Sequence, residues 1–285
     1  MPKVLAVDLD GTLFYPKRPR TLISFANIKF LRDFIDAGNR VIIVTSRNCD
    51  FVAKTAAKID RKIDYVCING AQIIIDGKLI FNESLPVGRS FEIFQDMKDH
   101  FDQPLAWFLD SDKYQNLVYD NGNGWFVLQF FKYYYKAQGV YQQDYLADND
   151  KFMDELKHGN IYRMLLYFGL GKRRMNIAKE VNRHMRVAYP DIVEASWINN
   201  VVEIAPRNCH KAAALERIIV HEGINREDVY VVGDSGNDIS MFQAFHDHSF
   251  CMDHAHDAVK KFATHTIKRV HDLRKILLNE EVNHD

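Results

Sequence analysis

The sequence has few cysteines and no long apolar run, and each shortage excludes a class of protein. The four cysteines are scattered along the chain, and no two of them form a C-x-x-C pair: Cys49, Cys67, Cys209 and Cys251. This spacing argues against a zinc ribbon or a disulfide framework and is typical of the reducing cytosol. No apolar stretch approaches the ~20 residues that a membrane-spanning helix needs. We therefore expect neither a disulfide-stabilised fold nor a membrane partner.

The sequence also lacks an excess of charge of either sign. Its 37 lysines and arginines balance 38 aspartates and glutamates, for a formal net charge of −1. A neutral chain has no overall electrostatic attraction to nucleic acid or to an anionic membrane, so we expect neither as a partner. The N-terminal stretch reaches the carboxylate of Asp8 too early for a secretory signal, and we expect a cytoplasmic location. No pattern in the sequence indicates an oligomeric state.

The first eighty residues alternate between strand-like and helical patterns. In chain order these patterns cover residues 3–7, 25–35, 40–45, 51–59 and 65–68. Strands that alternate with helices predict right-handed βαβ units and a parallel sheet. A hairpin is expected next, over residues 73–80, because the dipeptide Asp76-Gly77 between two apolar runs favours a tight turn.

The middle of the chain follows a different pattern. Its expected helices and strands cover residues 91–101, 105–109, 115–119, 125–135, 151–157, 162–168, 173–189 and 192–197. Strands in succession indicate a separate α+β module. Alternation resumes with a helix over 211–222, a strand over 229–232 and a helix over 237–245. We predict an α/β fold with a Rossmann-like parallel-sheet core, residues 1–83 and 199–285, and an inserted α+β domain, residues 84–198.

An aromatic run over residues 125–135 has two interpretations. It resembles a surface on which nucleic-acid bases stack, but it has few charged neighbours and the chain is neutral. We favour a strand of the inserted module that packs on helices.

Two carboxylates follow the first expected strand, in the segment Asp8-Leu9-Asp10-Gly11-Thr12. Side chains two residues apart at the exit of a strand point to the same side, and close carboxylates repel unless a cation or proton lies between them. Oxygen ligands suit Mg²⁺, and the pair permits one acid to attack while the other transfers a proton. The alternative is a solvated turn, since Asp-Gly is a common turn dipeptide.

Three further segments lie at strand ends or helix starts, where ligands bind in open α/β sheets. Thr45 and Ser46 offer hydroxyls and backbone N–H groups to a phosphate, or they form an ordinary polar loop. Lys211 opens a helix, where a cation is unfavourable unless an anion is bound, although a surface lysine is the simpler interpretation. The segment Gly233-Asp234-Ser235-Gly236-Asn237-Asp238 supplies further oxygen ligands or a structural turn.

Taken together and in this order, the segments resemble the haloacid dehalogenase superfamily, and more narrowly its Cof-type phosphatases with a large α/β cap. The matching motifs are Asp8-Leu9-Asp10-Gly11-Thr12, Thr45-Ser46, Lys211 and Gly233–Asp238, with Ile68-Asn69-Gly70-Ala71 and Val202-Glu203-Ile204-Ala205-Pro206. The resemblance covers nearly the whole chain. It implies that residues 84–198 form a cap that sets substrate specificity.

The resemblance implies a role for each matching residue. Asp8 is expected to attack phosphorus and form an aspartyl-phosphate, while Asp10 protonates the leaving oxygen and then activates water. Mg²⁺ is expected at the Asp8 and Asp234 carboxylates and the Asp10 backbone carbonyl, with Asp238 and Asn237 in support. Thr45, Ser46 and Lys211 are expected to bind the phosphoryl oxygens, with Asn237 beside them. The expected substrate is a small phosphorylated metabolite, such as a sugar phosphate.

Two alternatives share the fold, and one segment departs from the family. A phosphomutase of this fold would need basic cap residues aimed at the site, the candidates being Arg163, Lys172, Arg173 and Arg174. A non-catalytic protein would bind a phosphorylated ligand without turnover.

Where the family reads Met-Gly-Asn-Ala, this chain has Met252-Asp253-His254-Ala255. A second metal site of His246, His248, His254 and His256 is a minor hypothesis.

Overall fold

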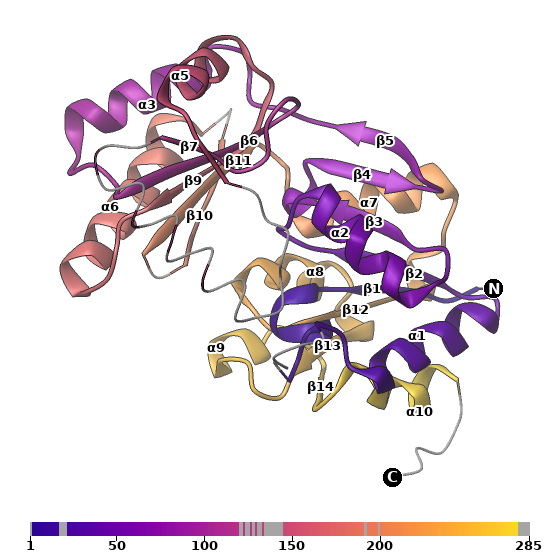
Figure 1. The fold of residues 1–285 in the computed structure, drawn as a ribbon. Coiled ribbons are helices and arrows are strands. Elements are labelled where there is room, and N and C mark those ends of the chain that lie inside the picture. The colour runs from indigo at the N-terminus through magenta and orange to yellow at the C-terminus, as the bar shows by residue number, and fades with distance from the viewer. Residues whose placement is uncertain are drawn as a thin grey trace. The chain divides into compact units, whose positions relative to one another are not determined.

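The computed structural model describes residues 2–16, 22–119, 145–190, 193–198 and 200–278, together with Gly122, Phe126, Gln129 and Tyr133 (Figure 1). The chain forms two compact units. The first consists of Met1–Asn82 and His210–Asp285, and the second of Glu83–Cys209. Among the described residues, no helix has the length and apolar character needed to cross a bilayer.

The first unit is built on an eight-stranded sheet in the order β14-β13-β12-β1-β2-β3-β4-β5. Six of its strands are parallel: β1 (Val4–Val7), β2 (Arg40–Val44), β3 (Asp64–Cys67), β12 (Val229–Gly233), β13 (Ser249–Met252) and β14 (His265–Ile267). The hairpin β4 (Gln72–Ile75) and β5 (Lys78–Asn82) is antiparallel and turns through Asp76 and Gly77, both at positive φ. The expected parallel sheet and hairpin are therefore confirmed, and β1 lies inside the sheet between β2 and β12.

Helices cover the two faces of this sheet because alternate strand residues point to opposite sides. On one face, Val4 and Ala6 share an apolar core with α7 (Lys211–Glu222), α8 (Ile239–Ala244) and α9 (Asp257–Lys260). The other helices of the unit are α1 (Phe25–Asp36), α2 (Cys49–Ala56) and α10 (Arg274–Leu277). Helix α1 contacts β2 and α10. Its first turn is capped by Ser24, whose hydroxyl accepts the N–H of Asn27.

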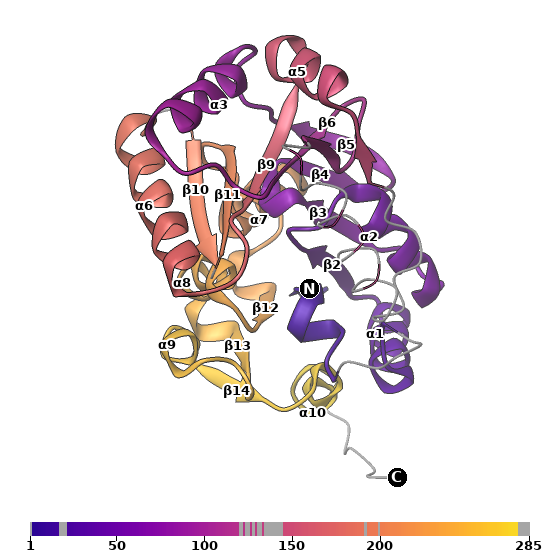
Figure 2. The same ribbon diagram turned by 60° about the vertical axis from the view of Figure 1, so that its left-hand side comes forward.

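The second unit is built on a six-stranded mixed sheet in the order β10-β11-β9-β6-β7-β8. Of these strands, Figure 2 labels β10, β11, β9 and β6. Its strands are β6 (Ala106–Ser111), β7 (Leu117–Tyr119), β8 (Leu146–Ala147), β9 (Ile161–Tyr167), β10 (Val193–Ile198) and β11 (Val201–Pro206). Helices α3 (Arg89–His100), α5 (Asn149–His158) and α6 (Lys172–Ala188) contribute Phe94, Phe152 and Val181 to one core with Trp107 of β6. This core is separate from that of the first unit, as an inserted module requires.

Two details differ from the sequence expectations. The inserted segment was expected to end at residue 198, but β11 pairs with both β9 and β10, so Val201–Pro206 belongs to the second sheet. The aromatic run 125–135, expected to be a strand, lies mostly outside the described residues. Its three described residues, Phe126, Gln129 and Tyr133, are helical, so the strand expectation is wrong at those positions.

Candidate active site

The functional residues lie beyond the carboxyl ends of neighbouring parallel strands. Asp8 follows β1 directly, Asp234 follows β12, and Thr45 follows β2. The strands are in register, with Val7 opposite Val232 on one side and Ile43 on the other. The backbone N–H of Asp8 extends the ladder by one bond, because it donates to the carbonyl of Val232 at 3.0 Å. Parallel pairing therefore brings these distant segments to one edge of the sheet.

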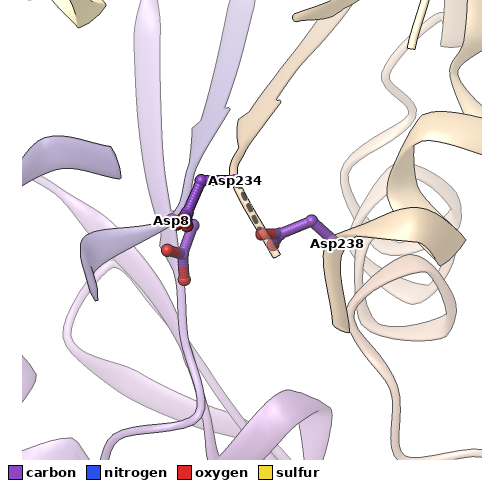
Figure 3. A group of neighbouring side chains, drawn as sticks. All are labelled: Asp8, Asp234 and Asp238. Carbon is purple, nitrogen blue, oxygen red and sulfur yellow. Dashed lines mark hydrogen bonds between the residues drawn. The ribbon is translucent and has the colours of Figure 1, made fainter. Parts of the chain in front are cut away.

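Three aspartates form a buried cluster at this edge. Carboxylate oxygens of Asp8, Asp234 and Asp238 all lie within 4.8 Å of one another (Figure 3). Asp8 and Asp238 are buried, and Asp234 is partly exposed. Among the described residues this is the only group of three or more histidines, cysteines and acids close enough to share an ion.

Lys211 lies inside the cluster and has no exposed surface. Its Nζ donates to Oδ1 of Asp8 at 2.6 Å and to Oδ1 of Asp238 at 2.7 Å. Although burial lowers the pKa of Lys211, the carboxylates of Asp238 and Asp8 raise it above its ordinary value. The side chain is therefore a fixed positive charge and not the surface lysine that its position alone would suggest.

Asp238 organises the loop after β12. Its Oδ2 accepts the backbone N–H groups of Asp234 at 2.9 Å and Ser235 at 3.0 Å, while its Oδ1 accepts Lys211. A Cβ on Gly233 would lie 2.3 Å from the Asp238 carboxyl carbon, so only glycine fits there. Because both oxygens already accept hydrogen bonds, Asp238 positions the other charges more than it offers a free ligand.

The carboxylate of Asp234 packs against the loop that follows Asp8. Its Oδ1 accepts the hydroxyl of Thr12 at 3.2 Å. Gly11 has a φ of +81°, and a Cβ at this position would lie 2.1 Å from Oδ2 of Asp234. Glycine is required for both the backbone conformation and the close approach. The motif therefore holds Asp8 next to Asp234, an acid from the far end of the chain.

The charges in the cluster do not balance without a cation. Three carboxylates face one buried ammonium, and burial raises the pKa of Asp8 well above its ordinary range, with Lys211 offsetting only part of this effect. Burial and the charge of Asp238 raise the pKa of Asp234 to about 6. Elevated pKa values of this kind mark a site where a cation or a proton is favourable. Oxygen ligands of this density fit a hard divalent ion such as Mg²⁺.

The raised pKa of Asp234 gives a pH dependence that a metal-free sample would show. The folded protein binds a proton at Asp234 more tightly than the unfolded chain, so this group makes folding less favourable as the pH rises from about 4 to 6. Relative to Asp234→Asn, we expect the wild type in chelator to lose up to about 3 kcal/mol of unfolding free energy between pH 4 and 7. Denaturant titrations at several pH values measure this difference. Parallel profiles for the two proteins would contradict it.

Asp10 is held apart from the cluster by Arg47. Nε of Arg47 donates to Oδ2 of Asp10 and Nη2 donates to Oδ1, each at 2.7 Å. The Asp10 side chain is 47% exposed, whereas that of Arg47 is 11% exposed and lies 4.3 Å above the Phe51 ring. Asp10 is still close enough that its charge contributes to the raised pKa of Asp8.

The remaining residues from the motifs support the loops around the cluster. Thr45 is buried, its Oγ1 accepts the N–H of Arg47 at 3.2 Å, and Ser46 follows it at the same strand end. The amide of Asn237 donates to Oδ1 of Asn69 at 3.2 Å and accepts the hydroxyl of Ser235. Asn237 therefore ties the loop after β12 to the loop after β3.

The four histidines do not form a second metal site. His248 stacks on Tyr230, His256 caps α9 with its ring nitrogen, and His246 contacts Thr264. His254 instead reaches the cluster, with Nε2 3.7 Å from Oδ2 of Asp234 and its ring stacked on Tyr15 at 3.7 Å. The hypothesis of a shared histidine site is therefore wrong, because the side chains have separate partners.

Sequence reasoning missed the roles of three residues at this site. Arg47 follows Ser46 and Thr12 ends the first motif, but side-chain partners over long sequence distances are not encoded in local patterns. His254 was noted only as a departure from the family pattern and as a candidate ligand of the second metal site. Its ring position beside Asp234 required the structure.

Nearly the whole chain matches a model of one protein family. Residues 5–274 match the model described as haloacid dehalogenase-like hydrolase. Over 93% of both chains, the sequence is 29% identical to the 5-amino-6-(5-phospho-D-ribitylamino)uracil phosphatase YwtE of Bacillus subtilis. It is 24% identical to the pyridoxal phosphate phosphatase YbhA of Escherichia coli, over 90% of each chain.

Solved structures share the fold at lower sequence identity. SMU.1108c from Streptococcus mutans superposes with a TM-score of 0.79 at 16% identity, covering 98% of this chain and 100% of that one. TM0651 from Thermotoga maritima gives a TM-score of 0.75 at 20% identity and covers 99% of both chains. The arrangement of a parallel core sheet with an inserted mixed sheet is therefore shared with these proteins.

Proposed function

Because the chain belongs to the haloacid dehalogenase-like hydrolases and is a Cof-like phosphatase of that superfamily, we propose that it hydrolyses a small phosphorylated metabolite through an aspartyl-phosphate at Asp8, with Mg²⁺ bound. The observation that carries this proposal is the position of Lys211. A fully buried ammonium that bridges Asp8 and Asp238 fixes one carboxylate at the end of β1 in a single orientation. A fixed carboxylate beside two further acids suits nucleophilic attack on phosphorus.

In this proposal one residue of the cluster is the nucleophile and another neutralises charge. Asp8 attacks phosphorus and displaces the leaving oxygen. Lys211 donates to both Asp8 and Asp238, and its buried positive charge would stabilise the negative charge of a phosphoryl group on Asp8. The hydroxyls of Thr45 and Ser46 and the backbone N–H of Ser46 complete the proposed phosphoryl pocket.

The Asp8 and Asp234 carboxylates and the backbone carbonyl of Asp10 would hold Mg²⁺, while Asp238 and Asn237 support them. The ion supplies neutralisation of the negative charge on the phosphoryl oxygens. Thr12 and Gly11 keep the Asp234 carboxylate in place for this purpose.

Asp10 serves as the acid and base of the reaction. It gives a proton to the leaving oxygen as Asp8 becomes phosphorylated. It then takes a proton from the water that attacks the aspartyl-phosphate, so that Asp8 and inorganic phosphate are released. Its side chain is 47% exposed to solvent, and in this structure both carboxylate oxygens accept hydrogen bonds from Arg47.

The substrate class follows from the relatives and not from the site itself. The named relatives act on a phosphorylated ribitylaminouracil and on pyridoxal phosphate, which are both small phosphomonoesters. We propose a substrate of this kind, selected by the second unit acting as a cap. In that unit Arg163, a candidate mutase residue, is buried and donates to the carboxylate of Asp110. An arginine already bound to an acid favours a phosphatase over a phosphomutase.

The proposal is tested by hydrolysis of p-nitrophenyl phosphate before and after removal of divalent ions. We expect the rate to fall by on the order of 10² or more in chelator, because the carboxylates are then uncompensated. Excess Mg²⁺ should restore it. Equal rates with and without the ion would contradict the metal requirement. Binding of phosphate in Mg²⁺ without any turnover of p-nitrophenyl phosphate or a phosphometabolite panel would instead support a non-catalytic binding protein.

A further inference from the structure

Arg47 makes a fork-shaped contact that occupies both oxygens of Asp10. The two N–H···O distances of 2.7 Å are those of a strong charge-assisted pair. The guanidinium of Arg47 packs on the ring of Phe51. The backbone N–H of Arg47 donates to Oγ1 of Thr45. The residue is therefore anchored beside the proposed phosphoryl pocket, and its charged end faces the exposed Asp10.

This pair conflicts with the role proposed for Asp10. A carboxylate oxygen that gives and takes a proton needs to approach the leaving group or water, and here each oxygen accepts a hydrogen bond from Arg47. The pair must open before Asp10 acts. When the pair opens, an oxyanion that takes the place of the Asp10 carboxylate restores the fork-shaped charge-assisted contact of Arg47.

We propose that Arg47 is a substrate-binding residue that exchanges the Asp10 carboxylate for oxygens of the phosphoryl group when substrate binds. This inference rests on the proposed function. A guanidinium binds phosphate oxygens with the same fork geometry that it uses for a carboxylate. One charge-assisted pair is lost and another is gained, so the exchange needs little free energy. Asp10 is released only when a phosphoryl group is present.

Binding of inorganic phosphate in Mg²⁺, measured by calorimetry on the full chain, tests the exchange without turnover. We expect Arg47→Ala to weaken phosphate binding about tenfold or more. Arg47→Lys keeps the charge without the fork and should give an intermediate affinity. The matched control is Arg61→Ala, because Arg61 makes the same two-bond contact with Asp36 on an exposed surface. It should leave the affinity unchanged.

Combination with Asp10→Asn separates an exchange of partners from simple electrostatics. With Arg47 intact, Asp10→Asn removes the competing carboxylate, so phosphate should bind more tightly. In the Arg47→Ala background this gain should be smaller by at least about threefold. Melting temperatures of all variants show whether each is folded, and Arg47→Lys provides the comparison if the alanine variant is not.

The outcomes distinguish this inference from the proposed function. Unchanged phosphate affinity in Arg47→Ala and Arg47→Lys, or an equal Asp10→Asn effect in both backgrounds, would overturn the inference while wild-type hydrolysis stands. A wild-type protein that neither binds phosphate in Mg²⁺ nor hydrolyses p-nitrophenyl phosphate would overturn both.

Discussion

Asp8→Asn is expected to abolish hydrolysis of p-nitrophenyl phosphate, with a fall in turnover on the order of 10⁴ or more. The amide has the shape of the carboxylate but does not attack phosphorus. The loss should not arise from unfolding. Burial raises the pKa of Asp8, so its ionised form is disfavoured in the fold, and a neutral side chain is tolerated there. The variant should melt at or above the wild-type temperature in metal-free buffer.

The control for this substitution is Asp247→Asn, which makes the same chemical change on a side chain that is 97% exposed. It should retain wild-type turnover. Phosphorylation of the protein itself gives a second readout, since wild type quenched during turnover should carry acid-stable but hydroxylamine-sensitive phosphate and Asp8→Asn should carry none. Turnover that survived in Asp8→Asn would remove Asp8 as the nucleophile.

Lys211→Met is expected to lose both stability and activity. Methionine replaces the only buried ammonium of the cluster, which leaves Asp8 and Asp238 buried without their shared cation. Loss of one partner from a buried ion pair typically costs about 3–5 kcal/mol. We expect a decrease of this size in unfolding free energy near neutral pH without metal, and turnover should fall by on the order of 10²–10³. Denaturant unfolding and p-nitrophenyl phosphate hydrolysis measure the two effects.

Two further variants test whether the effect of Lys211→Met comes from the buried acids it leaves unpaired. Lys62→Met removes an exposed lysine that pairs with Asp76 at 2.6 Å, and should leave the unfolding free energy almost unchanged, because surface ion pairs contribute little. Lys211→Met combined with Asp238→Asn removes one of the unpaired charges and should recover part of the stability, but not the activity. A Lys211→Met protein as stable as Lys62→Met would show that the ammonium does not balance the buried acids.

The sequence was most informative where the chemistry follows strand order. Asp8 and Asp234 were expected near each other because parallel strands place their carboxyl ends at one edge, and the structure brings their oxygens within 4.8 Å. The resemblance to the haloacid dehalogenase superfamily is likewise confirmed, because the family model matches residues 5–274. Local patterns were sufficient for these conclusions because they depend on backbone periodicity and on the residue types at strand ends.

The same patterns were insufficient where side-chain partners decide the outcome. Lys211 alone suggested a surface lysine, and only tertiary packing against two acids explains its complete burial. The Asp10–Arg47 pair depends on the conformation of a long side chain, which periodicity does not encode. The boundary at residue 198 failed for a related reason, since β11 joins the second sheet through pairing with β9, a segment far back in the chain.

The position of β1 inside the first sheet also has a consequence for how the protein is made. The backbone N–H of Asp8 bonds to Val232, which is synthesised later than Asp8 and only after the whole inserted unit. The inserted unit has its own core and is complete earlier, so it is able to fold while the first sheet still lacks β12. A nascent chain that stops before Val229 contains Asp8 but lacks β12, Asp234 and Asp238, the acid that Lys211 bridges to Asp8. We therefore expect a chain that ends before Val229 to show no hydrolysis of p-nitrophenyl phosphate.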